Sequence, residues 1–202
     1  RQISTFVDLS AIAPGVNVAK NEGFKTVITI RGVGYETNQN AIATPSVSYH
    51  LDGIYVASPY SLQTDFLDLE RVEVLRGPQG TLFGQNSTGG AINVVTKAPT
   101  TDETYGSADL TLGDHGLFKV RAGFNRPLTD NLAMRASFIS NIRDGFTENL
   151  SNGQDLDDAD SFSARVRLKY EPSDTFRANF MAQIFDEDRN GAAQKGIIDP
   201  TP

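Results

Sequence analysis

The part of the sequence most like a chemical site is the glycine-rich stretch from Gly77 to Gly90. Glycine-rich loops can cradle phosphate groups, because their backbone N–H groups approach a ligand closely. This stretch lacks the spacing G-x-x-x-x-G-K followed by Ser or Thr, and it contains no lysine. The shorter Gly32-Val33-Gly34 has no third glycine, so it does not complete a dinucleotide fingerprint. The sequence therefore argues against nucleotide binding.

Candidate metal ligands and catalytic groups are sparse. The aspartates between Asp155 and Asp160 resemble a calcium loop only loosely, because there is no glycine at the sixth position and no closing glutamate. A solvated acidic loop is the simpler interpretation. His50 and His115 lie far apart, and the chain has no cysteine. No motif combines a nucleophile, a base and an acid, so we expect no metal site, no cofactor and no enzymatic activity.

Composition narrows the class of protein further. The net charge of -7 argues against a nucleic-acid binder, which usually carries a basic patch. No apolar run is long enough for a transmembrane helix, whereas the alternating strands of a membrane barrel give a mild mean hydropathy such as the -0.31 found here. The chain starts at Arg1 without a methionine or an apolar leader, so we expect a removed signal peptide or a start downstream of one.

Short elements separated by Gly and Pro turns fill the first half of the sequence. Asp52-Gly53 lies between two β-branched runs, which is a hairpin signal. Pro14-Gly15 closes a helical stretch. Together these signals predict a small α+β domain. The predicted helices are residues 7–13 and 65–70, and the predicted strands are residues 27–31, 47–50, 53–56, 71–76 and 92–96.

Long alternating segments follow Pro99. One of them places Phe118 and Val120 on one face and Lys119 and Arg121 on the other, which is the period of a strand with one apolar face. The segments run about ten residues, enough for a tilted strand to cross a bilayer. Tight turns alternate with a long acidic connection, as in membrane barrels. A soluble antiparallel meander with one wet face is the alternative. The segments are residues 107–112, 118–125, 132–143, 162–170 and 176–184.

In a membrane barrel the apolar side chains of such strands face lipid and the polar ones face the lumen. We therefore expect the lipid-facing set to include Phe118, Val120, Phe138, Val166, Leu168 and Phe180. The expected lumen-facing cations are Lys119, Arg121, Arg135, Arg143, Arg165, Arg167, Lys169 and Arg177.

Residues 68–99 read DLERVEVLRGPQGTLFGQNSTGGAINVVTKAP. This stretch resembles the signature of the plug domain of TonB-dependent receptors, both in its L-R-G-P-x-G-x-L-F-G core and in its G-G-x-I-N-V-x-T-K ending. Three earlier pieces are similar to the same family in order and spacing: residues 8–18, the I-T-I-R-G strand at 28–32, and the hairpin at 45–56. The motifs cover about the first hundred residues, and the alternating strands cover the rest.

The resemblance implies an α+β plug domain over residues 1–99, followed over residues 100–202 by antiparallel transmembrane β-strands of an incomplete barrel of about 22 strands. It implies TonB-dependent active transport of a scarce nutrient across the bacterial outer membrane. A ferric siderophore is the favoured cargo. A carbohydrate or cobalamin is the alternative within the family, and a soluble β-rich binding or adhesion module is the alternative outside it. The implied partners are outer-membrane lipid and the TonB complex, engaged through an N-terminal box not present in this chain.

The resemblance also assigns roles to single residues. Arg31 and Arg76 occupy positions whose arginines pair with barrel glutamates in related receptors, although each could instead be a solvated charge at a strand end. The loops at residues 33–44 and 57–64 correspond to apical loops that touch ligand. Their candidate ligand-binding residues are Tyr35, Asn38, Gln39, Tyr60 and Gln63. The signature glycines, suited to turns and close backbone approach, are Gly32, Gly53, Gly77, Gly80, Gly84, Gly89 and Gly90.

Overall fold

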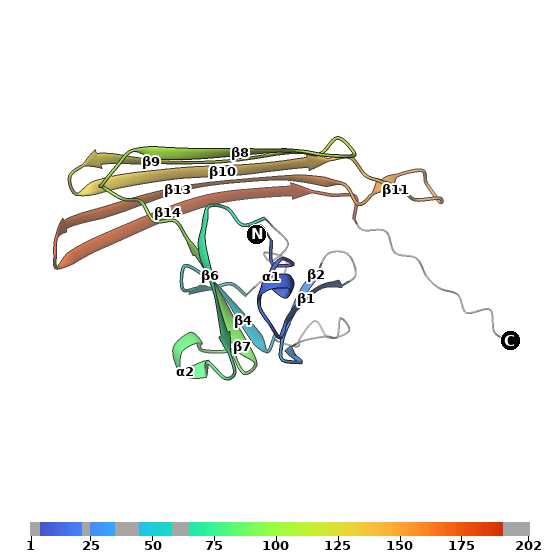
Figure 1. Cartoon of the computed structure of the whole chain (residues 1–202), viewed down its shortest axis with the longest axis horizontal. Helices are drawn as coiled ribbons and strands as arrows, with labels where there is room; N and C mark the ends of the chain where they lie inside the picture. The colour runs from blue at the N-terminus through green and yellow to red at the C-terminus, as the bar shows by residue number, and fades with distance from the viewer. Residues whose placement is uncertain (1–4, 22–24, 35–44, 58–64, 192–202) are drawn as a thin grey trace.

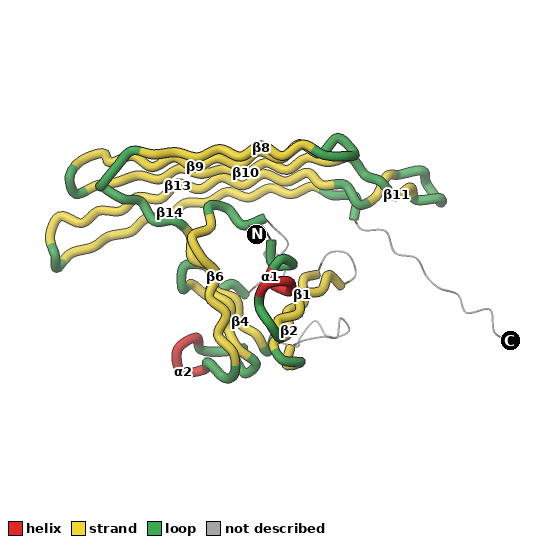
Figure 2. The backbone as a smooth tube through the Cα atoms, in the orientation of Figure 1, coloured by secondary structure: helices red, strands yellow, loops and turns green. Residues whose placement is uncertain are grey.

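The computed structural model describes residues 5–21, 25–34, 45–57 and 65–191. A long five-stranded sheet lies across one end of a smaller α+β domain (Figure 1). We call the five-stranded sheet the wall. The smaller domain, from α1 to β7, is called the plug. The tube in Figure 2 shows that strands dominate both parts and that the helices are short.

The wall is an antiparallel meander, in which each strand pairs with the next along the chain. This arrangement confirms all five predicted alternating segments, most of which extend further than predicted because the backbone pairing continues past the apolar stretch. The sheet is open, with β8 and β14 at its edges. The wall strands are β8 (Tyr105–Leu112), β9 (Phe118–Thr129), β10 (Leu132–Arg143), β13 (Ala159–Ser173) and β14 (Phe176–Asp188), and a small hairpin of β11 (Thr147–Glu148) and β12 (Asp155–Leu156) extends from one end.

Strand register sorts the wall side chains onto two faces. Phe138 in β10 lies opposite Ala122 in β9 and Ala164 in β13, so the three share a face. All six residues predicted to face lipid lie on this outer face. Most of its large apolar side chains are exposed, from Phe138 at 39% to Leu112 at 68%. The predicted lumen-facing cations occupy the opposite, inner face. The alternation predicted from sequence is therefore present in the structure.

The described residues of the plug form two small sheets and two one-turn helices. In the larger sheet, of order β5-β4-β7-β6, β4 runs parallel to β7 and the remaining pairs are antiparallel. No helix among the described residues is long and apolar enough to cross a membrane. The first sheet comprises β1 (Val16–Asn21), β2 (Lys25–Ile30) and β3 (Val33–Gly34); the second comprises β4 (Val47–Leu51), β5 (Ile54–Tyr55), β6 (Leu69–Arg76) and β7 (Gly90–Thr96); the helices are α1 (Leu9–Ile12) and α2 (Gly80–Phe83).

Residues 65–70 were predicted to form a helical turn, and that prediction is wrong. The backbone there is not helical, and β6 begins at Leu69. Asp68 has a left-handed φ of 56°, which a right-handed helix cannot accommodate. Its carbonyl accepts a hydrogen bond from the N–H of Lys97 (2.9 Å), which directly follows β7 in the chain. A long-range contact therefore overrides the local pattern.

Two other differences lie near the start of the chain. The helix predicted for residues 7–13 is present only as α1, because Gly15 takes a φ of 79° and turns the chain away. The family resemblance of residues 8–18 implies an opening helix and turn, whereas β1 begins at Val16 and pairs with β2. Val16 and Val18 are both buried, so a short V-x-V alternation already marks this strand.

The plug core joins both sheets, with Ile30, Val47 and Ile92 among its buried members. Gly90 explains how closely the sheets approach. A Cβ atom built on it would collide with the carbonyl oxygen of Leu75 and lie 2.8 Å from Cδ1 of Ile30. Only glycine fits at this junction. Five of the seven signature glycines have a left-handed φ, the exceptions being Gly80 and Gly89.

Candidate functional site

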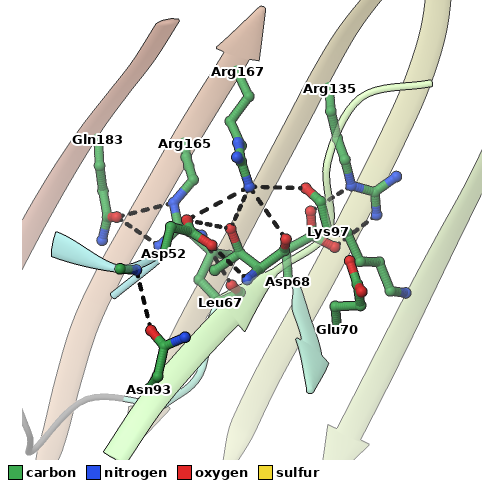
Figure 3. A network of polar contacts seen from close by, with 12 residues as sticks. Asp52, Leu67, Asp68, Glu70, Asn93, Lys97, Arg135, Arg165, Arg167 and Gln183 are labelled. Atoms are coloured by element: carbon green, nitrogen blue, oxygen red, sulfur yellow. Dashed lines mark hydrogen bonds and ion pairs between the residues drawn. The ribbon is translucent and has the colours of Figure 1, made fainter. Parts of the chain in front are cut away.

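The plug and the wall meet through charged side chains of opposite sign (Figure 3). Carboxylates come from the plug, and cations come from the inner face of the wall. Ion pairs removed from water interact more strongly than exposed pairs, because less solvent screens them. We call this set the charge network, and its members are Asp52, Asp65 and Asp68 of the plug with Lys119, Arg135, Arg165 and Arg167 of the wall.

The most buried pair of the network joins Asp68 to Arg135. Nε of Arg135 donates to Oδ2 at 2.5 Å, and Nη2 donates to Oδ1 at 2.6 Å, a bidentate arrangement. The Arg135 side chain is 1% exposed and that of Asp68 is 8% exposed. The guanidinium also lies 5.2 Å from the ring centroid of Tyr105. This geometry fixes the start of β6 to the middle of the wall.

Gly123 in β9 provides the space for that ion pair. A Cβ atom built on Gly123 would lie 3.0 Å from Nη2 of Arg135 and 3.3 Å from Oδ1 of Asp68. Both contacts are tighter than ordinary van der Waals packing. The absence of a side chain at this position therefore lets the carboxylate and the guanidinium meet against the sheet.

Asp65 makes a second contact with the wall. Its Oδ1 accepts a hydrogen bond from Nζ of Lys119 at 2.7 Å, and its Oδ2 accepts one from Nδ2 of Asn141 at 3.3 Å. Lys119 and Asn141 are register partners on neighbouring strands, so a single carboxylate spans β9 and β10. Asp65 and Asp68 lie three residues apart, and together they tie one plug segment to the wall.

The third contact is at the β4–β5 turn. Asp52 and Gly53 both have positive φ, as in the predicted two-residue hairpin turn. The Asp52 carboxylate accepts hydrogen bonds from the N–H (2.8 Å) and hydroxyl (2.7 Å) of Thr96, and it lies 3.5 Å from Nη1 of Arg167. Arg167 in turn donates to the carbonyls of Thr96 and Lys97. One wall arginine thus holds the point where β7 leaves the plug.

The connection between β7 and β8 is fixed to the wall by Asn125, which is fully buried. Its Oδ1 accepts a hydrogen bond from the N–H of Thr100 (3.0 Å), and its Nδ2 donates to the carbonyls of Thr100 (2.9 Å) and Glu103 (2.7 Å). A buried amide that satisfies three backbone groups holds a connection firmly. Nothing in the sequence around Asn125 identified this role.

Arg165 is the network member without a direct carboxylate contact among the described residues. Its Nε and Nη2 donate to Oε1 of Gln183 at 3.0 and 2.7 Å, and its Nη1 donates to the carbonyl of Leu67 at 3.3 Å. Asp52 and Asp68 are near enough to interact with it electrostatically. The side chain is buried, so neighbouring wall and plug groups replace water around its charge.

Two plug side chains have ionisation shifted by burial. Burial raises the pKa of the Tyr49 phenol well above its ordinary value, so this group stays neutral at physiological pH. Burial lowers the pKa of His50, and a backbone hydrogen bond at Gly53 offsets part of that effect. The His50 ring packs edge-on against Phe83 at 4.8 Å, and its Nε2 lies 3.2 Å from the hydroxyl of Ser48. Both groups therefore act as uncharged packing residues.

The residues assigned from the family resemblance lie elsewhere. Arg31 and Arg76 are exposed, and neither forms an ion pair with a carboxylate within the described residues. Their pairing with barrel glutamates stays a prediction. The ligand-binding candidates lie outside the described residues, so their predicted role is not tested: these are Tyr35, Asn38, Gln39, Tyr60 and Gln63.

The sequence predicted only the wall side of the charge network. The wall cations were predicted to face the lumen, but no plug carboxylate was assigned as their partner. The available signal was the repeated acid in residues 65–70, DFLDLE. Basic residues recur on one face of four of the five predicted wall strands. Pairs such as Asp65 with Lys119 and Asp68 with Arg135, 54 and 67 residues apart, cannot be derived from local spacing.

Comparison with known proteins places these features in context. The family model described as "TonB-dependent Receptor Plug Domain" matches residues 1–91. The pesticin receptor of Yersinia pestis is 31% identical over 172 residues, which cover 82% of this chain and 24% of the receptor. The ferrichrome outer membrane transporter and phage receptor of Escherichia coli is 25% identical over 197 residues, covering 94% of this chain and 25% of the transporter.

Solved structures agree with the sequence matches. The crystal structure of the ferric yersiniabactin uptake receptor from Yersinia pestis superposes with a TM-score of 0.72 at 27% identity, covering 87% of this chain and 28% of that one. The copper transporter OprC superposes with a TM-score of 0.72 at 16% identity, covering 95% and 29%, which shows a shared fold alone. The chain spans about a quarter of the length of the curated relatives it matches.

Proposed function

The chain belongs to the TonB-dependent receptors of the bacterial outer membrane, and from that premise we propose that the protein imports a ferric siderophore by TonB-dependent active transport. Its fold is a plug domain followed by antiparallel strands of the kind found in these receptors. The matched relatives named above are receptors and transporters rather than enzymes. The protein is accordingly placed in the outer membrane of a Gram-negative bacterium.

The observation that carries the proposal is the seating of the plug on the charged face of the wall. The opposite face of the same strands exposes a continuous set of apolar side chains, including Leu110, Val166 and Phe180. In a plugged barrel, one face of each strand contacts lipid and the other contacts the plug that fills the lumen. The apolar outer face and the charged inner face of the wall fit this arrangement. A soluble meander would expose its polar face and bury its apolar face, which is the reverse.

The siderophore assignment rests on what the relatives transport. The ferric yersiniabactin uptake receptor matches 87% of this chain at 27% identity. A ferric enterobactin receptor of Pseudomonas aeruginosa is 29% identical over 182 residues. These names favour a ferric chelate over a carbohydrate or cobalamin as the cargo class. We propose TonB, acting on the N-terminal side of the plug, and outer-membrane lipid as the partners.

Cargo contact is proposed for the two apical loops. Tyr35 and Tyr60 offer flat aromatic surface, and Asn38, Gln39 and Gln63 offer neutral hydrogen bonds. Replacing both tyrosines by alanine should weaken cargo binding to the purified full-length receptor while leaving assembly intact. Affinity equal to that of the parent receptor would remove the loops from the proposed site without affecting the family assignment.

Uptake of radioactive iron tests the function directly. The full-length receptor is expressed in a Gram-negative host without its own ferric-siderophore receptors, and chelates of the catecholate, hydroxamate and phenolate classes are supplied in turn. We expect energy-dependent uptake of at least one chelate in the strain with TonB and none in the strain without it. Uptake of cobalamin or an oligosaccharide in place of every ferric chelate would assign the protein to the alternative cargo class.

A further inference from the structure

Phe6 is buried near the start of the described chain, at 2% exposure. Its ring packs edge-on against Tyr49 in β4, with centroids 5.0 Å apart, and against Phe66, with centroids 4.6 Å apart. The turn that carries Phe6 is well ordered by hydrogen bonds: the N–H of Thr5 donates to Oδ2 of Asp8, and the N–H of Leu9 donates to the carbonyl of Phe6. One aromatic side chain therefore links the N-terminal segment to the larger plug sheet.

Phe66 lies within the segment that makes the densest contact with the wall. Its neighbour Asp65 binds Lys119, and the carbonyl of Leu67 accepts a hydrogen bond from Arg165. Phe66 itself is a buried member of the plug core. The Phe6 ring thus packs against a segment, residues 65–67, that is hydrogen-bonded to the wall.

A cleft of about 390 Å³ lies between plug and wall at this point. Phe6, Tyr49 and Phe66 line its plug side. Three polar residues of the inner face line its wall side, and these are Ser163, Arg165 and Gln183. Phe6 is the lining residue nearest to the N-terminus among those described. Moving it would enlarge the cleft toward the buried guanidinium of Arg165.

We propose that Phe6 is a positioning residue for transport: its ring holds the segment around Phe66 against the wall, and its withdrawal toward the N-terminus opens the cleft beside Arg165. The inference rests on the proposed function, in which TonB acts on the N-terminal side of the plug. Tension on this segment pulls on apolar ring contacts, which separate without breaking an ion pair. The Asp68–Arg135 pair and the hydrogen bonds of Asn125 stay in place during this step and retain the rest of the plug.

The test uses cysteine labelling of the full-length receptor, with any other cysteine removed. Ser163→Cys reports on the cleft, because Ser163 is buried on its wall side. Ser87→Cys reports on a distant buried site, where the Ser87 hydroxyl donates to the carbonyl of Gly84. Each reporter is combined with Phe6→Ala, with Phe6→Leu, or with the matched control Val7→Ala, whose parent side chain is 44% exposed. The probe is a membrane-impermeant maleimide added to purified receptor.

Phe6→Ala should raise the labelling rate at position 163 by about tenfold or more, since local opening no longer has to displace the buried ring. Phe6→Leu keeps apolar volume and should give a smaller increase, so it provides an answer even if the alanine variant assembles poorly. Val7→Ala should label at the parent rate, and the rate at position 87 should not change in any variant. An unchanged rate at 163 in both Phe6 variants, or equal acceleration at 163 and 87, would overturn the proposal.

Energised cells separate this inference from the proposed function. In cells with TonB, the parent Ser163→Cys receptor should label faster than in cells treated with an uncoupler, whereas Phe6→Ala should label fast under both conditions. If TonB-dependent uptake of iron is absent and energy has no effect on the parent, the proposed function fails, even though Phe6→Ala still opens the cleft in purified receptor. If uptake is normal and Phe6→Ala opens nothing, the role of Phe6 fails alone.

Discussion

The plug and the wall bury opposite kinds of side chain. The plug packs apolar residues such as Leu9, Ile30 and Ile92 between its sheets, as a water-soluble domain does. The wall buries Arg135 and Arg165 on its inner face and exposes Phe180 and other large apolar residues on its outer face. The plug therefore forms its core from its own residues, whereas the charged inner face of the wall depends on plug residues to pair with it.

This contrast also explains the polarity of the contact between them. A row of buried cations needs counter-charges or acceptors, because an unpaired buried charge is costly. The plug supplies them from turns and strand starts, at Asp52, Asp65 and Asp68, rather than from its core. Charges therefore join the plug to the inner face of the wall, whose own large apolar side chains are mostly on the opposite face.

The largest test of the contrast removes one partner of the deepest ion pair. Asp68→Ala leaves Arg135 charged and buried, which should destabilise the assembled receptor by about 3–5 kcal/mol. The double variant Asp68→Ala with Arg135→Met should recover most of that loss, because the apolar side chain removes the unpaired charge. Chemical unfolding of the detergent-solubilised full-length receptor measures both. Equal losses in the single and double variants would show that the charge pairing is not what matters there.

The second test places a charge on the outer, apolar face of a wall strand. Val166 lies on the outer face, and an arginine there should cost about 2–4 kcal/mol if the position is near the bilayer centre. The matched control is Lys169→Ala on the inner face, where the partly exposed pair with Glu171 should contribute about 1 kcal/mol or less. Heat-modifiability of the full-length receptor reports assembly. Similar behaviour of the two variants would contradict the assignment of the faces.

Gly123→Ala tests the Asp68–Arg135 pair by adding a single methyl group beside it. The added methyl group lies 3.0 Å from Nη2 of Arg135, so the ion pair must shift, at a cost of about 1–3 kcal/mol. In the background of Asp68→Ala with Arg135→Met the same glycine change should cost much less, since methionine adapts its shape. The coupling between the changes, measured by chemical unfolding, tests whether Gly123 serves this pair. Additive effects would indicate that it does not.

Sequence predicted most of the architecture and only part of the site. Apolar and polar residues such as Phe118 and Lys119 alternate with the two-residue period of a strand. This period is a local property of the backbone, so the five strands and their two faces could be derived from the sequence. The Asp52-Gly53 turn was predicted for the same local reason. Contacts such as Asp68 with Arg135 join residues 67 positions apart, and no local pattern specifies them. The helix at residues 65–70 was predicted wrongly for the same reason, because contacts with distant residues set the conformation of this segment.

The smallest expected effect concerns acid. The buried wall cations are arginines, which do not titrate near neutral pH, whereas the plug buries His50 with its pKa lowered by desolvation. Between the lowered folded pKa and the ordinary value of 6.5, the unfolded plug binds more protons than the folded plug. Stability from neutral His50 is therefore complete above pH 6.5 and declines as the pH falls below it, by at most about 1.4 kcal/mol per pH unit.

His50→Gln tests this because glutamine is polar, of similar size and does not titrate. The plug transition, followed by chemical unfolding of the full-length receptor from pH 7.5 down to pH 5, should move to lower denaturant in the parent and move less in the variant. His115 lies outside the plug beside Phe146 and serves as the matched control. His115→Gln should keep the acid dependence of the parent. If His50→Gln keeps it too, the acid sensitivity resides in another group, and the contrast between a titratable plug interior and a non-titrating wall no longer holds.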